Sequence, residues 1–310
     1  MEKILIAGGL GFIGTNLIKN LVSNGYSDIT VLDNNSNQTG YIDEKSGIKI
    51  IVGDMRDIEV VNQAVSGKTM VINLAAHTRV IDSISDPVEN FQINVAGSIN
   101  ILESMRKNNV MTFINASTGG AIIGDVKPPV HEEMVAKPAS PYGASKLAVE
   151  GYCSAYSQSY GMNTISLRFS NIYGPYCNRK ESVVSAFLRA IEEKGLVTVY
   201  GDGTQTRDYI FTEDLVDGIV AAIRLKNSGV YQLGSGQPCS INELIEIIRK
   251  CVPVTFDVHY EPARAGEVLH TYCDISKASR ELEFNPSTKL EEGILKTWQW
   301  FVENRAGICN

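Results

Sequence analysis

A tyrosine and a lysine in the stretch SPYGASK, residues 140–146, have the types and the spacing of an acid–base pair. Tyr142 and Lys146 lie four positions apart, so a helix would place them on one face, a turn from each other. A lysine ammonium near a phenol favours the phenolate and lowers the phenol pKa, so the tyrosine could take a hydroxyl proton near neutral pH. An exposed aromatic followed by a solvated lysine would show the same spacing, so this interpretation needs support from the rest of the chain.

A third group is expected from the strand that precedes this helix. Its segment NASTGG contains Ser117 and Thr118, and either hydroxyl could hydrogen-bond a substrate oxygen. The alternative is an ordinary turn at the end of a strand. Spacing alone does not choose between the two residues.

A glycine-rich turn near the N-terminus predicts a dinucleotide site. Gly8, Gly11 and Gly14 follow the first apolar run and open a helical pattern, where glycines allow a tight turn and a close approach to a pyrophosphate. Asp33 ends the second apolar run, about 20 residues further on, and could accept both ribose hydroxyls of NAD. The segment DNNSNQTG that begins there has no basic residue for a 2′-phosphate, which favours NAD over NADP. The positive nicotinamide ring of NAD would also favour the Tyr142 phenolate.

The segment GDMRD, residues 53–57, follows the third apolar run. Asp54 is expected near the adenine of the dinucleotide. Asp57 is expected to cap the next helix. The two interpretations are compatible because they use different residues.

A strand–helix alternation in the first half of the chain must position these groups. Apolar residues show helical spacing at 11–24, 57–66, 87–107 and 140–160. Short apolar runs typical of buried strands alternate with them, at 3–8, 29–33, 48–54, 70–76, 111–117 and 163–171. This order predicts an α/β fold with a Rossmann-type doubly wound parallel sheet.

After about residue 170 the pattern loosens, which predicts a smaller, interleaved α/β domain that packs against the first and builds a cleft. Helices are expected at 182–194, 212–226, 240–250 and 288–304, and short strands near 197–200, 230–233 and 254–258. The predicted division is a Rossmann domain over 1–170, with about 207–229 added, and a second domain over 171–310.

Composition and charge narrow the class of protein. The 310 residues are 44% hydrophobic and 20% charged, as in an ordinary soluble globular protein. The net charge of −7 and the pI of about 5.3 disfavour nucleic acid as a partner. The six cysteines are scattered without a CxxC pair, so neither a metal site nor a disulfide framework is expected. The N-terminal apolar run breaks at Gly8, too early to span a membrane, and a cytoplasmic protein is expected.

With these residues in view, the chain resembles the extended short-chain dehydrogenases/reductases, in particular their NAD-dependent nucleotide-sugar epimerases and dehydratases. The resemblance covers nearly the whole chain. The motifs that carry it are GGLGFIG (8–14), GDMRD (53–57), NLAA (73–76), SPYGASK (140–146), RFSNIYGP (168–175), GDGTQTRDYI (201–210) and RAGE (264–267). It implies tightly held NAD, a UDP-linked nucleotide-diphosphate sugar as substrate, and a homodimer that pairs through helices 87–107 and 140–160. Apolar residues of these helices would belong either to that interface or to the core: Ile93, Ile101, Leu147 and Tyr156.

The resemblance also implies roles for single residues. Tyr142 is the base, and Lys146 is its partner and holds the nicotinamide ribose. Thr118 is the hydroxyl member when its strand is aligned from the start, whereas counting back from Gly124 would place Gly119 there. The residues implied for the cofactor are Gly8, Gly11, Phe12, Ile13, Gly14, Asp33, Asn34, Asp54, Met55, Leu74, Ala75, Ala76, Asn94, Tyr142, Lys146 and Phe169. Those implied for the substrate are Thr78, Arg79, Asn171, Val184, Tyr200, Arg207, Arg264, Glu267 and Thr271.

Within the substrate set, the resemblance implies that Asn171 grips the phosphates. Arg207 and Arg264 are implied to clamp the pyrophosphate, which suits their planar, forked guanidinium groups, and Glu267 to contact a ribose. Thr271 falls where related epimerases have a residue that limits pocket size. Because threonine is small, an N-acetylated hexosamine would fit as well as a plain hexose.

The two residues after Thr118 bear on the reaction. The 4,6-dehydratases of this family have an Asp–Glu pair there and xylose-forming decarboxylases tend to have a glutamate, whereas this chain has Gly119 and Gly120. What remains is the pattern of a 4-epimerase, acting on a UDP-hexose or a UDP-N-acetylhexosamine through a transient 4-keto sugar. The alternatives on this scaffold are a 4,6-dehydratase, a decarboxylase, a 4-ketoreductase or a non-catalytic NAD-binding regulator, although such regulators usually lack Tyr142 or Lys146.

Two further positions are unusual for this family. Arg79 in the stretch HTRV could pair with a sugar carboxylate, or it could be an ordinary surface arginine. Ile123 stands where relatives often have a tyrosine, which concerns the wall of the pocket and not the chemistry.

Overall fold

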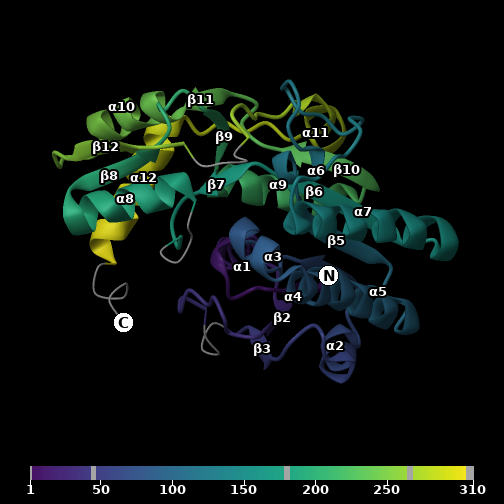
Figure 1. Ribbon diagram of the computed structural model, residues 1–310. Helices are drawn as coiled ribbons and strands as arrows, with labels where there is room; N and C mark the ends of the chain where they lie inside the picture. The colour runs from purple at the N-terminus through teal and green to yellow at the C-terminus, as the bar shows by residue number, and fades with distance from the viewer. Residues whose placement is uncertain (1, 43–46, 178–181, 264–267, 305–310) are drawn as a thin grey trace.

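A parallel sheet forms the centre of the molecule in this computed structural model, which describes residues 2–42, 47–177, 182–263 and 268–304 (Figure 1). Over these residues the sheet has seven strands in the order β10-β6-β5-β4-β1-β2-β3. Their bounds are β1 (Lys3–Ala7), β2 (Asp28–Asp33), β3 (Lys49–Val52), β4 (Met70–Asn73), β5 (Thr112–Thr118), β6 (Asn163–Phe169) and β10 (Gly229–Leu233). The chain runs outward from β1 to β3 and then returns to β4 on the other side of β1. This reversal is the switch point at which open α/β sheets bind ligands, and the predicted doubly wound fold is confirmed.

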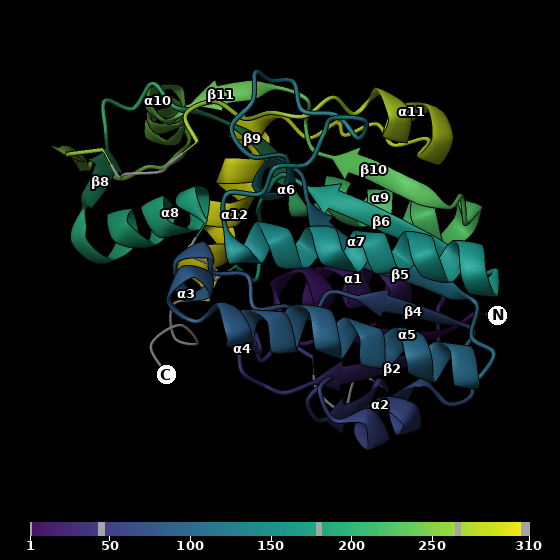
Figure 2. The ribbon, with the colours of Figure 1, turned by 45° about the vertical axis from the view of Figure 1, so that its right-hand side comes forward.

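Helices cover both faces of this sheet (Figure 2). One layer contains α1 and α9, which pack on each other, and the opposite layer contains α2, α5 and α7. Successive residues of β1 alternate between the layers: Ile4 and Ile6 pack in the cluster with α1, and Leu5 and Ala7 in the cluster with α5. The strands are apolar on both sides because both faces are covered. The helix bounds are α1 (Phe12–Ser23), α2 (Ile58–Val65), α5 (Gly97–Lys107), α7 (Pro141–Tyr160) and α9 (Thr212–Leu225).

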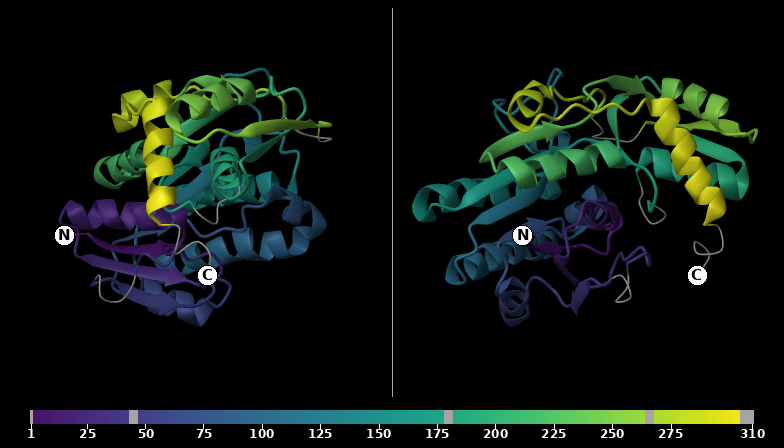
Figure 3. Two further views of the ribbon diagram at one scale, coloured as in Figure 1. Left: turned by 90° about the vertical axis from the view of Figure 1, so that its left-hand side faces the viewer. Right: turned by 180° about the vertical axis from the view of Figure 1, so that it is seen from behind.

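The later part of the chain packs around a second apolar core (Figure 3). In the described residues it contains a three-stranded sheet in the order β11-β9-β7 and a pair of β12 with β8. The bounds are β7 (Asn171–Tyr173), α8 (Val183–Lys194), β8 (Leu196–Tyr200), β9 (Thr206–Phe211), β11 (Pro238–Ser240), α10 (Ile241–Cys251), β12 (Asp257–Glu261) and α12 (Leu290–Glu303). Between these elements α9 and β10 return to the first sheet, where α9 packs on α1 and β10 pairs with β6.

Most predicted elements are present, with bounds that differ by a few residues. The predicted helix 87–107 is divided into α4 (Pro87–Phe91), a π-helical turn (Gln92–Ala96) and α5, and the strand predicted near 230–233 extends the main sheet. Asp57 caps α2 as predicted, since its carboxylate accepts the Glu59 and Val60 backbone N–H groups. Periodicity did not predict several short elements because a few residues do not show a period. These are α3 (Val80–Ser85), α6 (Gly120–Ile123), α11 (Ser276–Leu282), β7, β9 and β11.

Candidate active site

The glycine turn joins β1 to α1 at the switch point of the sheet. Gly8 has a φ of +75°, and a Cβ added there would lie 2.7 Å from the backbone nitrogen of Ala75. A Cβ added at Gly14 would lie 2.5 Å from the Cα of Gly9. Both positions exclude a side chain because the chain's own backbone is in the way. At Gly11 an added Cβ would lie 3.4 Å from the Gly8 carbonyl oxygen, an ordinary contact, so its missing side chain leaves space on the ligand side of the turn.

A cavity of about 390 Å³ opens beside this turn. Its wall is formed by the turn, the end of β2 and the segments that follow β3 and β4. The site lies at the carboxyl ends of parallel strands and at the N-terminus of α1, the position at which a pyrophosphate is bound in such sheets. The wall residues that belong to the predicted cofactor set are Gly8, Gly11, Asp33, Asn34, Asp54, Met55, Leu74, Ala75 and Ala76.

The Asp33 carboxylate forms part of this wall. The residue is 8% exposed, its Oδ2 accepts the Leu10 N–H at 3.0 Å, and its Oδ1 accepts the Asn35 N–H at 2.8 Å. Burial raises the pKa of the Asp33 carboxyl, and the two backbone N–H groups oppose that rise. An ionised carboxylate has about four acceptor sites, so sites remain for two ribose hydroxyls.

Arg56 is a cavity residue that the sequence argument did not identify. Its guanidinium nitrogens lie 2.8 Å from Asp54 Oδ2 and 3.0 Å from Glu89 Oε1. The hydrogen bond from Arg56 is the main cause of a lowered Asp54 pKa. The arginine was visible in GDMRD, two positions after Asp54, but its approach to Glu89 on α4 depends on the packing of α4 against α3 and α7.

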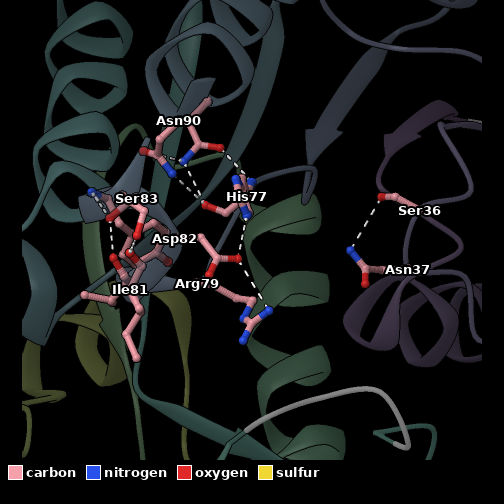
Figure 4. Close-up of polar contacts among 12 residues, drawn as sticks. Ser36, Asn37, His77, Arg79, Ile81, Asp82, Ser83 and Asn90 are labelled. Carbon is pink, nitrogen blue, oxygen red and sulfur yellow. Dashed lines mark hydrogen bonds and ion pairs between the residues drawn. The ribbon is translucent and has the colours of Figure 1, made fainter. Parts of the chain in front are cut away.

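The segment after β4 forms another part of the wall through His77 (Figure 4). Asn94 accepts the His77 backbone N–H at 2.8 Å, and the amides of Asn90 and Asn94 both donate to the His77 carbonyl oxygen at 3.1 Å. The His77 ring Nε2 lies 3.3 Å from Asp82 Oδ2, which also lies 3.5 Å from Arg79 Nη1. Asn94 was predicted as a cofactor contact. It is buried, and its amide binds the backbone of His77, which lines the cavity.

The remaining members of the predicted cofactor set lie outside this wall. Phe12, Ile13 and Gly14 form the first turn of α1, where backbone N–H groups lack partners within the helix. The side chains of Phe12 and Ile13 pack against the core. Phe169 is buried at the end of β6, where its register partner on β5 is Thr118.

The predicted acid–base pair lies at the start of α7. Ser140 caps this helix, since its Oγ accepts the Gly143 N–H at 3.2 Å. The Tyr142 backbone N–H donates to Ser83 Oγ at 3.2 Å. This bond ties the first turn of α7 to α3, so the tyrosine is held both by its own helix cap and by a neighbouring element.

The side chains of Tyr142 and Lys146 reach the end of β5. The Tyr142 phenol lies close enough to the Thr118 side chain for hydrogen bonding between them to act on the phenol pKa. Lys146 is buried, and its Nζ donates to the Ala116 carbonyl oxygen at 2.9 Å. The structure therefore brings the predicted tyrosine, lysine and threonine to one point on the sheet.

The pKa of Tyr142 differs in direction from the sequence expectation. Burial raises it to about 12, and the hydrogen bond with Thr118 opposes the rise. Lys146 was expected to lower this pKa, but it is not among the causes of the shift, in which desolvation of the phenol is the largest. A further positive charge at the site is therefore needed before the phenol can act as a base near neutral pH.

Ser117, the other hydroxyl that sequence spacing allowed, faces a different partner. It is buried, and its Oγ donates to Glu150 Oε1 at 2.6 Å. Glu150 also pairs with Arg168 on β6. The contact with Tyr142 therefore falls to Thr118, and Ser117 belongs to a buried polar cluster beneath α7.

The predicted gatekeeper Thr271 approaches the segment that follows Thr118. Its backbone N–H donates to the Thr206 carbonyl oxygen at 3.2 Å, and its Oγ1 lies 3.2 Å from where a Cβ at Gly120 would be. Arg207, next to Thr206 on β9, donates from Nη1 to the carbonyl oxygens of Thr206 at 2.9 Å and Leu269 at 3.0 Å. The sequence separates Gly120 from Thr271 widely, so their contact is a product of the fold.

Other members of the predicted substrate set lie on separate elements. The Asn171 amide, at the start of β7, donates to the Asp208 carbonyl oxygen at 3.2 Å. Val184 is buried in the second core, while Tyr200 at the end of β8 and Thr78 before α3 are exposed. Ile123, where relatives often have tyrosine, is buried in a small apolar cluster. Arg264 and Glu267 lie outside the described residues.

Metal sites, membrane-spanning helices and disulfides are the other features considered for the described residues. No group of three or more His, Cys, Asp or Glu side chains among them is placed to hold a metal ion. In the same part of the chain, no helix has the length and apolar character needed to cross a membrane. The cysteines there, Cys153, Cys177, Cys239, Cys251 and Cys273, are free thiols.

Known proteins resemble this chain over nearly its whole length. The profile of the NAD dependent epimerase/dehydratase family matches residues 4–234. A Methanocaldococcus jannaschii protein with the provisional name UDP-glucose 4-epimerase is 36% identical over an alignment of 307 residues, and the match covers 97% of this chain and 99% of that protein. The crystal structure of a UDP-glucose 4-epimerase of Thermotoga maritima with UDP-glucose has a TM-score of 0.92 and 31% identity, covering 97% of this chain and 99% of that one. A UDP-N-acetylglucosamine 4-epimerase of Methanobrevibacter ruminantium M1, in complex with UDP-N-acetylmuramic acid, has a TM-score of 0.91 and 29% identity, covering 98% and 99%.

Proposed function

The chain belongs to the NAD dependent epimerase/dehydratase family, and we propose that within it the protein is a 4-epimerase of a UDP-hexose or a UDP-N-acetylhexosamine. Membership makes it an NAD-dependent enzyme of sugar nucleotides. The observation that carries the finer proposal is the closeness of the Tyr142 phenol to the Thr118 hydroxyl, which is followed in the chain by Gly119 and Gly120. The site thus has a device for exchanging one proton, and the next two positions supply no carboxyl group for an elimination.

NAD is the cofactor, and the residues at the switch point fit it. Asp33 suits the ribose hydroxyls, and the open side of Gly11 with the first turn of α1 suits the pyrophosphate. The wall of Asp54 and Arg56 suits the adenine. When bound, NAD supplies a hydride acceptor and then a hydride donor for one carbon of the sugar.

The proton chemistry follows from α7 and β5. Tyr142 takes the proton of the sugar 4-hydroxyl as C4 becomes a ketone, and returns it when C4 is reduced. Thr118 orients the phenol through their hydrogen bond. Lys146, held against Ala116, keeps a positive charge one helical turn away, which favours the phenolate. Because the sugar must present its other face between the two steps, the nucleotide has to be held more firmly than the sugar.

The proposed substrate contacts lie on the second group of elements. Asn171 and Arg207 hold the diphosphate, and Thr271 borders the sugar beside Gly120. The small Thr271 side chain leaves room for an N-acetyl group. The further contacts proposed from the sequence are Thr78, Val184, Tyr200, Arg264 and Glu267.

Arg79 supports a neutral sugar rather than a sugar acid. Its guanidinium lies 3.5 Å from the Asp82 carboxylate, and its side chain is 56% exposed. A substrate carboxylate would have to compete with Asp82 and with solvent for this charge. We therefore expect no preference for UDP-glucuronate.

Product analysis without added cofactor tests the proposed reaction. The purified protein is incubated with UDP-glucose, UDP-N-acetylglucosamine and UDP-glucuronate, and the configuration at C4 is determined by NMR. We expect the 4-epimer of one or both neutral sugars, NAD in the purified protein, and no net formation of NADH. A product that has lost its 6-hydroxyl or released carbon dioxide, or a need for stoichiometric NADH, would contradict the epimerase assignment.

A homodimer is the proposed assembly, and the apolar surface of α3 and α4 supports it. Ile81, Ile84, Val88 and Phe91 are exposed by 65%, 62%, 66% and 49%. These helices pack on α7, one of the two helices expected to pair. Light scattering of the wild-type protein should show twice the monomer mass. The Val88→Glu variant should show the mass of a single monomer. A monomeric wild-type protein would contradict the proposal.

Two residues considered for that interface belong to the core instead. Ile101 and Tyr156 are buried in the cluster between the sheet and the helices α2, α5 and α7. Ile93 and Leu147 are partly buried against neighbouring clusters. The exposed apolar residues of α3 and α4 are therefore the better positions for testing association.

A further inference from the structure

Three consecutive residues of β5 each meet a different side chain of α7. The Ala116 carbonyl oxygen accepts from Lys146 Nζ at 2.9 Å, Ser117 Oγ donates to Glu150 Oε1 at 2.6 Å, and the Thr118 side chain lies within hydrogen-bonding reach of the Tyr142 phenol. The three helix residues are spaced by four positions, so they lie along one face of α7, which runs beside β5 and β6 (Figure 2). The end of the strand is thus registered against just over two turns of the helix.

Of the three helix residues, Glu150 is bonded to the neighbouring strand β6 as well as to β5. Its carboxylate forms a bidentate pair with Arg168, with Nε at 2.9 Å from Oε1 and Nη2 at 2.7 Å from Oε2. The Glu150 and Arg168 side chains are 6% and 5% exposed. Arg168 is the register partner of Ser117 in the sheet. One carboxylate therefore joins α7 to two neighbouring strands at the level of the proposed active site.

Stability alone does not explain charges at this position. Removing two ions from water costs several kcal/mol each, and apolar residues of similar volume commonly give equal or greater stability than a buried ion pair. The Nη1 atom of Arg168 is buried without a hydrogen-bond partner in the described structure, which adds to that cost. What a forked, bidentate pair supplies and an apolar pair does not is a defined direction and register.

We propose that Glu150 is a positioning residue, which acts with Arg168 and Ser117 to set the register of α7 on β5 so that Tyr142 meets Thr118. The proposal rests on the proposed function, because it takes Tyr142 as the residue that exchanges the proton. A shift of about 1 Å in a reacting group can cost about 100-fold in rate. The rate should therefore depend on Glu150 although it is two helical turns from Tyr142.

The test replaces the ion pair by an apolar pair, Glu150→Met with Arg168→Met, so that no buried charge is left without a partner. We expect the double variant to fold, to retain NAD and to keep its KM for the sugar nucleotide within about threefold. Its kcat should fall by about 10-fold or more, in line with a misplaced base. A crystal structure should show the Tyr142 phenol displaced from Thr118. A double variant with wild-type kcat would overturn the proposal.

Thr164→Val is the matched control. The Thr164 hydroxyl is buried and donates to the Cys153 carbonyl oxygen at 3.0 Å. This bond joins β6 to α7, as the pair of Arg168 and Glu150 does, but further from the proposed site. We expect a lower melting temperature and an unchanged kcat. If Thr164→Val lowers kcat as much as the apolar pair does, general loosening of α7 explains both and the proposal fails.

Tyr142→Phe separates this proposal from the proposed function. If Tyr142→Phe is fully active, the proposed chemistry is wrong whatever the apolar pair does. If Tyr142→Phe is inactive while the apolar pair is fully active, the chemistry stands and the positioning role alone is wrong. Arg168→Lys, which keeps the charge but loses the fork, should lie between the wild type and the apolar pair in kcat.

Discussion

The Tyr142 phenol and the Thr118 hydroxyl lie close enough to act as hydrogen-bond partners where the first turn of α7 meets the end of β5. This contact joins a helix to the strand that precedes it across a connection of more than twenty residues. It brings together a group that can lose a proton and a group that can orient the phenol and a substrate oxygen.

Thr118 should matter to turnover through its hydroxyl. Thr118→Val keeps the shape of the side chain and removes the bond to Tyr142, so we expect kcat to fall by about 100-fold, as for loss of a proton-transfer partner. Thr118→Ser should restore most of the rate. Steady-state kinetics with NAD occupancy measured in parallel would check this, and an active Thr118→Val would refute the role.

Ser117→Ala is the matched comparison for that experiment. The Ser117 hydroxyl bonds Glu150 rather than the phenol, so its removal should lower kcat by less than about 10-fold. A larger effect from Ser117 than from Thr118 would show that the assignment of the two hydroxyls is reversed.

The ionisation of Tyr142 should depend on the charge of the cofactor. The folded chain raises its pKa to about 12, above the value near 10 of an unfolded tyrosine. The phenol therefore keeps its proton at neutral pH when no cofactor is bound. A cationic nicotinamide ring favours the phenolate, so with NAD+ bound the tyrosinate absorbance should appear at lower pH than without it.

Ultraviolet difference titrations of the wild type and Tyr142→Phe would isolate this signal. NADH is the control, because its ring carries no positive charge and should shift the titration much less. Equal titrations in the presence and absence of NAD+ would contradict the expected electrostatic effect.

Replacing the glycines of the turn should have two different effects, loss of cofactor binding at Gly11 and loss of stability at Gly14. Gly11→Ala should fold with a change in stability below about 1 kcal/mol, because only an ordinary contact awaits its Cβ, but it should lose NAD. Gly14→Ala should lower the free energy of unfolding by roughly 1–3 kcal/mol, because its Cβ would overlap the backbone of Gly9. Thermal unfolding of cofactor-free protein and the NAD content after purification give the two readouts. The distinction would be wrong if both variants unfolded early or both kept NAD.

Thr271 should control the size of the sugar that is accepted. A tyrosine at this position would extend toward Gly120, so Thr271→Tyr should lower kcat/KM for UDP-N-acetylglucosamine by about 10-fold or more, within the range for a steric pocket contact. Activity on UDP-glucose should change by less than about threefold. Thr271→Ser is the control and should behave as the wild type. An equal loss on both sugars would place Thr271 outside the sugar pocket.

Local patterns in the chain were sufficient for the sheet, the glycine turn and the placing of Tyr142 and Lys146 on one helix. Strands covered on both faces are largely apolar, and helices show their period, so their order could be predicted before any contact was known. The position of Asp33 in the cavity wall and the cap formed by Asp57 were likewise predictable, because each residue stands at a set distance from a strand or helix end. Short elements such as β7 and α3 carry no period, and they were missed.

Contacts between side chains that are far apart in the sequence could not be predicted from local patterns. Arg56 reaches Glu89, and Thr271 lies against Gly120, because helices and loops from different parts of the chain pack at the same edge of the sheet. Asn94 has the residue type of a ligand contact, yet the π-helical turn aims its amide at the backbone of His77.

Residue types and intervals along the chain thus established an NAD-binding α/β enzyme fold with a tyrosine and a lysine on one helix. Which hydroxyl of β5 meets that tyrosine, and which carboxylate sets the helix against the strand, depended on packing in three dimensions. The physical reason is that a chain pattern records backbone preference and burial, both local properties. The partner of a side chain depends on how whole elements are placed against one another, as α7 is placed on β5 by Lys146, Glu150 and Tyr142.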